Sequence, residues 1–399
     1  MKILFLQFGS KYYSDGKRFF TDGSLNNKIW NRYLTYSDKL TVIGKAEQSN
    51  GNSNINYDKL NEVPKEINLV LVKDLYNPKK NYVNLKLRKL IKNQIIKEIE
   101  SNDYIVIRSI TNDYNLFAAN YCIKHKKEFI VEVTGFGFDS LWYHDGILGK
   151  IMAVIVEKRM RCVIKKCPNV LYVTNKALQE RYKNHNYNVG CSDVEIEIDY
   201  KDLENRLKKI EKNKKNKRIV IGTIGPIDSK LKGQEHVIKA ISKLNNEYNY
   251  EFYYELVGRG EKDYLYQFVK KYKVEKYVNF IGELPHNKIF DWIDNIDIYI
   301  QPSFQEGLCR ALVEAMSRGC PVLSSNAGGN NELVNKNNIF KKGKYEQIIK
   351  ILKKIDYEFM VFEANRGFEE AKKFDREILN KTRNDFYEKC FSTFEGVKK

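Results

Sequence analysis

Short apolar runs alternate with stretches of helical periodicity along most of this chain. In the first half, the runs that predict strands are residues 3–8, 40–43, 69–72, 104–108, 129–133 and 170–174. In the second half, they begin at residue 218 and continue at 253–257, 278–281, 298–300 and 322–323. An alternation of buried strands with helices is typical of parallel sheets that helices cover. The sequence therefore predicts an α/β protein with two Rossmann-like halves.

The boundary between the halves is predicted from charge. Residues 199–217 are rich in Lys and Glu and end in K-N-K-K-N-K, which predicts an exposed helix tail and linker, with a basic arm that binds nucleic acid as the alternative. A chain of 399 residues is also long for a single core. We therefore expect an N-terminal domain at residues 1–200, a basic linker at 201–217, a C-terminal domain at 218–375 and a terminal helix at 376–399.

Two carboxylates lie close together in a strand–loop–helix unit of the second half. Glu306 is expected on the loop after the strand at 298–300, and Glu314 on a helix predicted to begin at Leu308. Open α/β sheets bind ligands at the carboxyl ends of their strands. A carboxylate can accept hydrogen bonds from two neighbouring hydroxyl groups, so this pair suits a sugar and a ribose. Either Glu alone is better explained as a solvated or helix-surface side chain, and only the combination of groups favours a binding site.

The same unit offers groups that favour phosphate. The free amides at the helix start carry partial positive charge, and Arg310 adds a planar set of donors. Gly328 and Gly329, after the next strand, allow backbone to approach a ligand closely. With the two carboxylates, these groups predict a nucleotide-sugar site, although the glycines alone would also suit an ordinary turn.

The string E-G-L-C-R-A-L-V-E-A-M-S-R-G-C-P, followed by G-G-N-N-E, resembles the donor-binding signature of retaining GT-B glycosyltransferases of family 4. It is especially similar to bacterial enzymes of capsule and O-antigen synthesis, although Cys309 stands where a Pro is common. The resemblance implies two Rossmann-like domains that face each other across a cleft, with the terminal helix packed back on the N-terminal domain. It also implies that Glu306 holds donor-sugar hydroxyls and Glu314 the nucleotide ribose, while Glu332 has a less defined role.

Further contacts to the nucleotide sugar follow from the resemblance. The turn V-G-R-G resembles the family's glycine turn beside the nucleotide, and F-I-G-E-L resembles the segment whose backbone meets the base. Besides Glu314, the residues expected to contact the donor are Gly23, Gly258, Arg259, Ile281, Gly307, Leu308, Gly328 and Gly329. A G-x-G turn by itself is as often an ordinary strand-to-helix turn.

One cation of the usual diphosphate pair is missing. The segment G-P-I-D-S-K-L-K-G resembles the loop that brings an Arg and a Lys to the donor diphosphate. Lys232 occupies the Lys position, but Pro226 occupies the Arg position. A departing diphosphate needs fixed cations or dipoles. We expect Arg310 to supply the missing charge; the alternatives are slow chemistry or an inactive site, and Lys232 could also be a plain surface lysine.

The acceptor is expected to bind the N-terminal half. Gly23 lies in a loop before the first helix, where the family's glycine loop approaches diphosphate and acceptor. Many family members carry a His after the strand at 129–133, where this chain has Glu132-Val-Thr-Gly. Glu132 and His144 are the candidates to orient or deprotonate an acceptor hydroxyl, with Asp139 and Asp145 as neighbours. A helix-capping role explains Asp139 or Asp145 equally well, and a surface position explains His144 equally well.

The charge pattern allows contact with a membrane, and the lipid-linked acceptors of the resembling families favour it. The formal net charge is +18, which attracts anionic partners without specifying a fold. Residues 79–97 hold seven basic side chains and no acidic one, interleaved with Leu and Ile, and residues 151–166 are similar. Such helices can lie on an anionic bilayer, although a sheet-covering helix with solvated lysines has the same pattern. Scattered cysteines without ligand-like spacing and a short apolar N-terminus predict a cytoplasmic protein.

These expectations combine into one reaction. We expect retaining transfer of a hexosyl or N-acetylhexosaminyl group from a nucleotide-diphosphate sugar, with UDP as the expected nucleotide, to a hydroxyl of a growing lipid-linked glycan. No Asp-x-Asp occurs, so we expect no metal clamp, and the donor is a co-substrate rather than a cofactor. The alternatives are an epimerase of the same fold and a basic nucleic-acid-binding protein. A nicotinamide oxidoreductase is disfavoured because the first strand lacks G-x-G-x-x-G.

Overall fold

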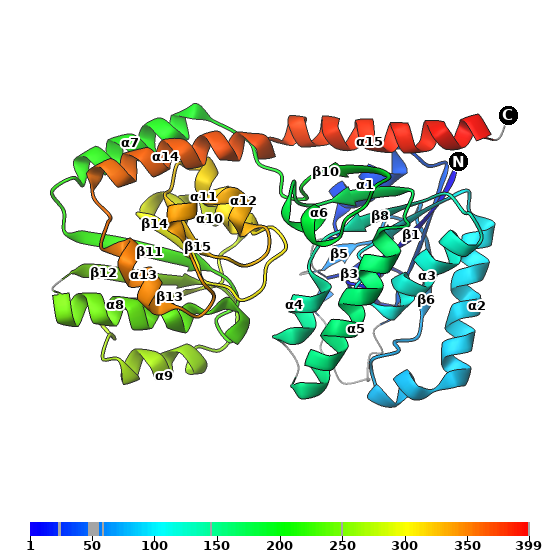
Figure 1. Cartoon of the computed structure of the whole chain (residues 1–399), viewed down its shortest axis with the longest axis horizontal. Coiled ribbons are helices and arrows are strands. Elements are labelled where there is room, and N and C mark those ends of the chain that lie inside the picture. Colours follow the sequence, from blue (N-terminus) through cyan, green and yellow to red (C-terminus); the bar gives the residue numbers. More distant parts are fainter. Residues whose placement is uncertain (23–24, 47–55, 58–59, 144–145, 249, 398–399) are drawn as a thin grey trace.

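The computed structural model describes residues 1–22, 25–46, 56–57, 60–143, 146–248 and 250–397. Two α/β halves lie side by side, and the last helix runs back along the first half (Figure 1). Each half contains its own parallel sheet. The predicted α/β class with two parallel sheets is thereby confirmed.

The sheet of the N-terminal half has seven parallel strands in the order β10-β9-β8-β7-β1-β4-β6. Its strands are β1 (Lys2–Leu6), β4 (Lys39–Lys45), β6 (Asn68–Val72), β7 (Tyr104–Arg108), β8 (Phe129–Val133), β9 (Asn169–Tyr172) and β10 (Tyr187–Gly190). Side chains alternate between two cores, since Ile3 and Phe5 of β1 face one cluster and Leu4 and Leu6 the other. The edge strand β10 was not predicted, because it is short, half-buried and partly polar.

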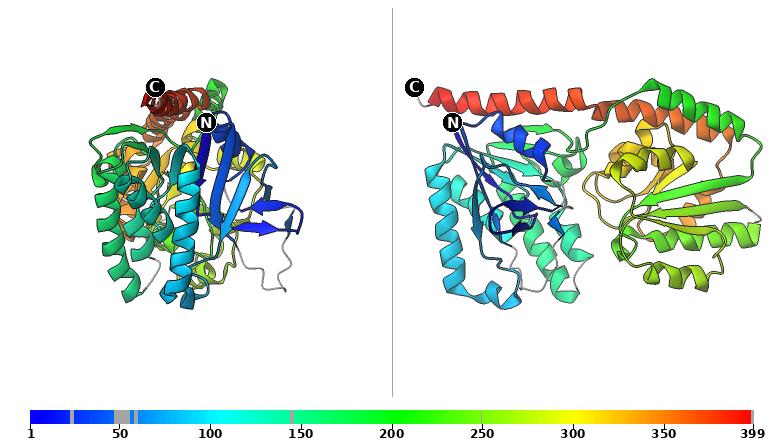
Figure 2. Two further views of the ribbon diagram at one scale, coloured as in Figure 1. Left: turned by 90° about the vertical axis from the view of Figure 1, so that its right-hand side faces the viewer. Right: turned by 180° about the vertical axis from the view of Figure 1, so that it is seen from behind.

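A small antiparallel sheet extends the N-terminal half. It consists of β2 (Tyr12–Ser14), β3 (Phe19–Thr21) and β5 (Asn61–Glu62) in the order β2-β3-β5. In the left panel of Figure 2 these strands project from the side of the main sheet. The sequence analysis did not predict this sheet, because strands of two or three residues are too short to show a periodicity.

Helices cover both faces of the N-terminal sheet. They are α1 (Asn27–Leu34), α2 (Leu85–Ser101), α3 (Asp113–Lys124), α4 (Gly137–Trp142), α5 (Ile147–Ile164) and α6 (Ala177–Arg181), with the 3-10 helix η2 (Lys79–Val83) before α2. Helices α2, α3 and α5 pack on one face through Ile91, Tyr114 and Met160. Helix α1 packs on the other face through Trp30 and Tyr33.

The C-terminal half has a six-stranded parallel sheet in the order β13-β12-β11-β14-β15-β16. Its strands are β11 (Arg218–Ile224), β12 (Glu251–Val257), β13 (Val278–Gly282), β14 (Ile298–Gln301), β15 (Val322–Ser325) and β16 (Ile339–Phe340). Its helices are η3 (Lys230–Lys232), α8 (Gln234–Tyr248), α9 (Asp263–Lys271), α10 (His286–Asn295), α11 (Arg310–Ser317), α12 (Asn330–Leu333), η4 (Lys336–Asn338) and α13 (Tyr345–Leu352). Helices α8, α9 and α13 contribute to one core and α10 and α11 to the other.

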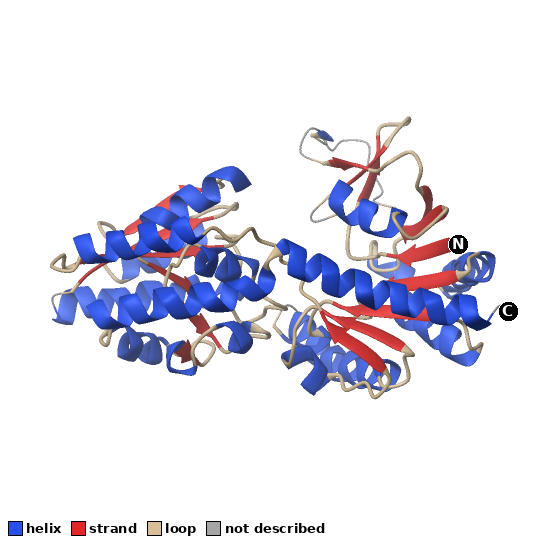
Figure 3. Ribbon diagram, turned by 90° about the horizontal axis from the view of Figure 1, so that it is seen from above, coloured by secondary structure: helices blue, strands red, loops and turns tan. Residues whose placement is uncertain are grey.

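The chain passes between the halves twice. The remaining helices are α7 (Tyr200–Lys212), α14 (Tyr357–Ala371), η5 (Lys372–Phe374) and α15 (Arg376–Val397). Helices α7 and α14 pack against each other on the C-terminal half, whereas α15 lies along the N-terminal half (Figure 3). In the described part of the chain, every helix is too short or too polar to cross a bilayer.

Most of the segment expected to be a linker belongs to the C-terminal half. Residues 201–212 lie in α7, where Arg206 is buried and donates to the carbonyl oxygens of Ile293 at 2.8 Å and Ile296 at 2.6 Å. A run of Lys and Glu looks exposed in sequence, but the side of the helix that carries Arg206 and Ile210 is buried. The segment is therefore a helix built into the second half rather than a free connection.

Candidate functional site

The loop that carries Glu306 leaves the middle of the C-terminal sheet. Strand β14 is fully buried between β11 and β15, and the chain then passes through residues 302–309 before α11 begins. The sequence predicted a helix start at Leu308, but the helix begins at Arg310, because Cys309 is still extended and forms the N-cap. Glu306 lies at the carboxyl end of the sheet, the edge where open α/β sheets bind ligands.

One oxygen of Glu306 is held by two donors. The Nζ of Lys232 donates to Glu306 Oε1 at 2.8 Å, and Gln301 Nε2 donates to the same oxygen at 3.1 Å. Gln301 is itself fixed, since its Oε1 accepts from the Tyr299 hydroxyl and its Nε2 also donates to Ser303. Within the described residues no donor reaches Oε2 of Glu306, so this oxygen can accept a hydrogen bond from a ligand.

Lys232 is fixed by the turn that follows it. It ends η3, and Gly233 has φ 65°, a left-handed conformation that favours glycine. A Cβ at Gly233 would collide with the carbonyl oxygen of Pro302, so the turn packs directly on the Glu306 loop. Burial lowers the pKa of Lys232, but the charge of Glu306 outweighs burial and the pKa is raised overall. Lys232 is therefore a permanent positive charge beside Glu306.

Glu314 is buried on α11 and contacts a histidine. Its Oε1 lies 3.2 Å from Nε2 of His286, the first residue of α10, whose side chain is 67% exposed. Helix α10 follows β13, which contains Ile281. The contact thus joins the segment expected to meet the base to the carboxylate expected to hold the ribose. His286 was not predicted, because its partner lies far away in the sequence.

Two glycine turns pack against the loops of this site. Gly328 has φ 51°, and a Cβ there would fall on the carbonyl oxygen of Glu306. Gly258 has φ 156°, and a Cβ there would collide with the carbonyl oxygen of Gly225, at the start of the loop that leads to Lys232. Both turns need glycine for conformation and for space. The predicted glycines therefore fix the loops of Glu306 and Lys232.

Two further cations lie along the same edge. Arg259 is exposed in the turn after β12, and its carbonyl oxygen accepts from the amide of Ile227 at 3.0 Å, next to Pro226. Arg310 is exposed at the first position of α11, beside the half-buried Leu308. In the described residues, no carboxylate forms an ion pair with Arg310.

The carboxyl ends of the two sheets meet at this edge. Gly307 has no space for a Cβ, because the carbonyl oxygen of Thr134, after β8, fills that position. Lys342, after β16, pairs with Asp139 of α4 at 3.3 Å. The Glu306 loop therefore contacts the N-terminal half directly, with the ligand-binding edges of both sheets towards each other.

Glu132 lies in a buried network of ion pairs and hydrogen bonds, and its carboxylate is already engaged by protein donors. Its carboxylate pairs with Arg108 at 2.5 Å and accepts from the hydroxyls of Tyr33, at 2.6 Å, and Tyr387. Only 2% of the residue is exposed. Burial first, and the charge of Glu132 second, raise the pKa of Tyr33 and Tyr387, so both remain donors. This environment favours a structural role for Glu132 over the acceptor role expected from the sequence.

Of the other residues predicted for the acceptor site, the structure describes Asp139. Gly23, His144 and Asp145 lie outside the described residues. Asp139 is buried at the start of α4 and lies 3.7 Å from Arg181 as well as close to Lys342. Its carboxylate is therefore occupied by cations at the contact between the halves.

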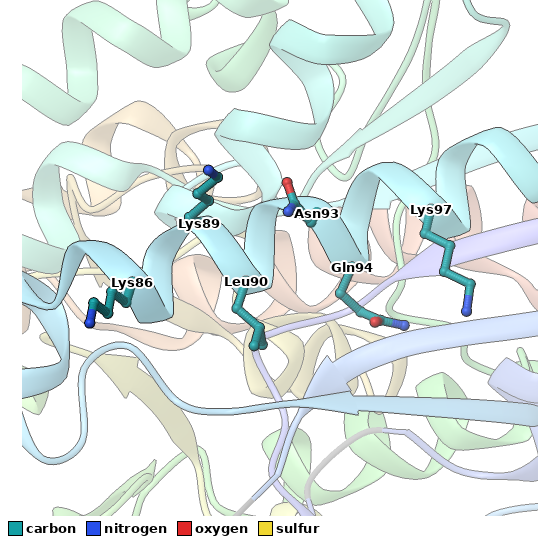
Figure 4. Close-up of a pocket in the computed structure, with 6 residues that line it drawn as sticks. All are labelled: Lys86, Lys89, Leu90, Asn93, Gln94 and Lys97. Carbon is teal, nitrogen blue, oxygen red and sulfur yellow. The ribbon is translucent and has the colours of Figure 1, made fainter.

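An open hollow lies elsewhere, on the outer face of α2 (Figure 4). Its lining residues are Lys86, Lys89, Leu90, Asn93, Gln94 and Lys97. A neighbouring hollow shares Lys86 and Leu90 and adds Lys73 and Lys80. Both are remote from the Glu306 loop and rich in lysine. Among the described residues, no three His, Cys, Asp or Glu side chains are grouped as a metal site would require.

Comparison with known proteins places these features in a family context. The family described as "Glycosyl transferases group 1" matches residues 205–356. Protein CapJ of Staphylococcus aureus is 34% identical over 368 residues, which cover 89% of this chain and 86% of CapJ. The O-antigen biosynthesis glycosyltransferase WclY of Escherichia coli is 26% identical over 255 residues, or 61% of this chain and 67% of WclY.

Solved structures share the fold along the whole chain. The structure of Anabaena HepE, described as a complex with UDP and glucose, matches with a TM-score of 0.61 and 17% identity. The match covers 97% of this chain and 99% of HepE. At such low identity the likeness establishes the architecture, which is the GT-B fold that the signature motif predicted.

Proposed function

Because the chain belongs to the group 1 glycosyltransferases of family 4, we propose that it transfers a hexosyl or N-acetylhexosaminyl group from a UDP-sugar to a glycan hydroxyl. The acceptor in this proposal is a growing, lipid-linked bacterial surface polysaccharide. Similarity to WclY, named for O-antigen biosynthesis, supports this class of product. The UDP and glucose in the HepE structure support UDP as the donor nucleotide.

The environment of Glu306 carries the proposal. Lys232 and Gln301 hold one carboxylate oxygen, and the other faces no protein donor within the described residues. A carboxylate in this state orients sugar hydroxyls without rearranging, because its own position is already fixed. Glu314 would accept from the ribose hydroxyls in the same manner, with His286 on its other side.

The leaving group in this proposal is a nucleoside diphosphate, whose developing charge must be stabilised. Lys232 supplies one fixed positive charge, and the exposed Arg310 supplies a second beside the amides at the start of α11. Pro226 offers no charge at the position where the family usually has Arg. Transfer with retention at the anomeric carbon is what the family resemblance implies.

The first test is thermal unfolding with UDP, GDP, ADP, CMP and NAD. A ligand at a hundred times its Kd adds about 2.7 kcal/mol to the stability of the native state. We expect UDP to raise the melting temperature by several degrees and the other compounds to raise it less. Stabilisation by NAD alone would contradict the proposal.

The second test is UDP release from a panel of UDP-sugars with a lipid-linked acceptor. Glu306→Gln keeps the size of the side chain but removes its charge, so we expect transfer to fall about 10²-fold or more. Glu247→Gln on the exposed end of α8 makes the same chemical change far from the site and should transfer like the parent. Interconversion of UDP-sugars without any acceptor would instead support the epimerase.

The acceptor also suggests where the protein meets a membrane. On α5, Ile147, Leu148, Ile151, Val154 and Ile155 follow helical spacing and are all exposed. On η2 and α2, Val83, Leu85 and Leu90 are exposed as well, next to the lysine-lined hollows. The first turns of α2 and α5 lie at the same end of the N-terminal half (Figure 1). Exposed apolar side chains among lysines suit the interface of an anionic bilayer.

Vesicle sedimentation tests this surface. We expect binding to vesicles of phosphatidylglycerol, weak binding to phosphatidylcholine alone, and loss of binding in the double variant Ile147→Ser and Leu148→Ser. Phe362→Ser removes an exposed apolar side chain from α14 on the other half and should leave binding unchanged. Equal binding by the parent and the double variant would overturn the proposed contact.

A further inference from the structure

Glu332 joins the two halves at the donor edge. It lies on α12, directly after the Gly328-Gly329 turn, but its carboxylate bonds to the other half. Its Oε1 accepts from the backbone amide of Ala177 at 2.5 Å, and its Oε2 accepts from the amide of Asn175 at 2.8 Å. Both oxygens are therefore used by backbone donors at the start of α6 in the N-terminal half.

The turn next to Glu332 is continuous with the Glu306 loop. The amide of Gly329 donates to the carbonyl oxygen of Gly307 at 2.7 Å. A Cβ at Gly328 would fall on the carbonyl oxygen of Glu306, so no gap separates the turn from the loop. Any movement of the turn is thus transmitted to the backbone of Glu306.

The N-terminal half is equally close to that turn. A Cβ at Gly329 would lie 3.0 Å from Cγ2 of Thr174, the residue before Asn175. Thr174 is buried, and its hydroxyl oxygen accepts a hydrogen bond from the backbone amide of Leu178, in the first turn of α6, at 3.0 Å. The backbone that Glu332 binds is therefore held in place by its own half.

We propose that Glu332 is a positioning residue for glycosyl transfer: it fastens the glycine turn to α6 and so holds Glu306 in register with the N-terminal half. This inference rests on the proposed function of Glu306. Charged acceptors bind backbone amides more strongly than neutral ones do, so the contact is firm enough to define the closed arrangement of the halves. Donor binding alone does not need this contact, because Glu306, Lys232 and Glu314 all belong to the C-terminal half.

The test separates donor binding from transfer. In Glu332→Ala we expect kcat to fall about 10- to 100-fold, the range that small misplacements of reacting groups produce. The Kd for UDP should change little, because the described groups proposed to hold the nucleotide, Glu314, Lys232 and Arg310, all belong to the C-terminal half. Glu332→Gln keeps one acceptor oxygen and the length of the side chain, so it should recover part of the lost kcat. Glu247→Ala, with the same loss of charge on α8, should behave like the parent.

A second measurement reports the arrangement of the halves. In solution scattering, the parent with UDP should have a smaller radius of gyration than Glu332→Ala with UDP. Unchanged kcat and an unchanged radius in the variant would overturn the proposal, as would a loss of UDP affinity equal to the loss of kcat. Parent protein without transfer activity would instead count against the proposed function itself.

Discussion

Two clusters of carboxylates and cations lie in the two halves, and they differ in how completely their charges are paired. In the C-terminal half, the Glu306 carboxylate has one oxygen held by Lys232 and one free within the described residues. In the N-terminal half, Glu132 is paired by Arg108 and two tyrosine hydroxyls. Residue type alone therefore does not identify a binding site. A hydrogen-bond acceptor that lacks a protein donor, at the edge of the sheet where ligands bind, does.

The N-terminal cluster, which we call the arginine network, contains three arginines and three carboxylates. Its members are Arg32, Arg108, Arg383, Glu132, Asp193 and Glu195. Arg108 connects Glu132 to Asp193, and Arg383 reaches Glu195 from the last helix at 3.0 Å. We expect the network to stabilise the fold and the Glu306 cluster to serve catalysis.

The largest effect should come from breaking the network. Arg108→Met leaves Glu132 and Asp193 without their shared cation. Removal of one partner from a buried ion pair costs about 3–5 kcal/mol, so the free energy of unfolding in urea should fall by about that amount. At low temperature, kcat of the folded fraction should remain close to that of the parent. A fall in kcat with an unchanged free energy of unfolding would contradict this assignment, because the arginine network would then serve catalysis rather than stability.

The corresponding change in the other cluster is Lys232→Met. It removes a fixed charge that the departing diphosphate needs, so we expect kcat to fall about 10²- to 10³-fold. The urea midpoint should move much less than in Arg108→Met. Similar losses of stability in both variants would show that the two clusters do not differ in role.

A smaller effect is expected at the ribose end of the donor site. Glu314→Gln still offers one oxygen, so the KM for the UDP-sugar should rise about tenfold, or about 1.4 kcal/mol, with a smaller change in kcat. His286→Ala should shift KM in the same direction, since His286 contacts the same carboxylate. Unchanged KM in both variants would remove Glu314 from the proposed site.

The smallest effect concerns pH. Burial raises the pKa of Asp193, but the charges of Arg108, Arg32 and Arg383 outweigh burial and hold it well below its usual value. A carboxylate with a lowered folded-state pKa stabilises the fold fully above its unfolded pKa, about 3.9, and loses that contribution as the pH falls further. Stability should therefore decline below about pH 4, and less steeply in Asp193→Asn. Parallel pH curves for parent and variant would contradict this.

More of the donor site than of the arginine network could be predicted from the sequence, because the residues of the donor site are close together in the sequence. Glu306, Glu314 and the Gly-Gly turn fall within one strand–loop–helix–strand unit, so their spacing already places them at one sheet edge. Lys232 required the resemblance, and His286 and Gln301 required the folded chain. Whether these residues bind the donor as expected is still a prediction.

The arginine network could not be predicted, because its members come from distant elements. Arg32 lies on α1, Glu132 on β8 and Arg383 on α15. No local pattern brings them together, and Glu132 alone suggested an acceptor-site base. The short strands of the small sheet and the edge strand β10 were not predicted for a related reason, since their pairing depends on neighbouring strands from other segments.

The return of α15 to the first half has a consequence for biosynthesis. Domains generally fold from the N-terminus while the ribosome is still extending the chain. Arg383 and Tyr387, which complete the pairing of Glu195 and Glu132, are made only after the entire C-terminal half. The N-terminal half therefore acquires these two partners only after the C-terminal half has been synthesised, so the order of synthesis makes the completion of one half depend on the other.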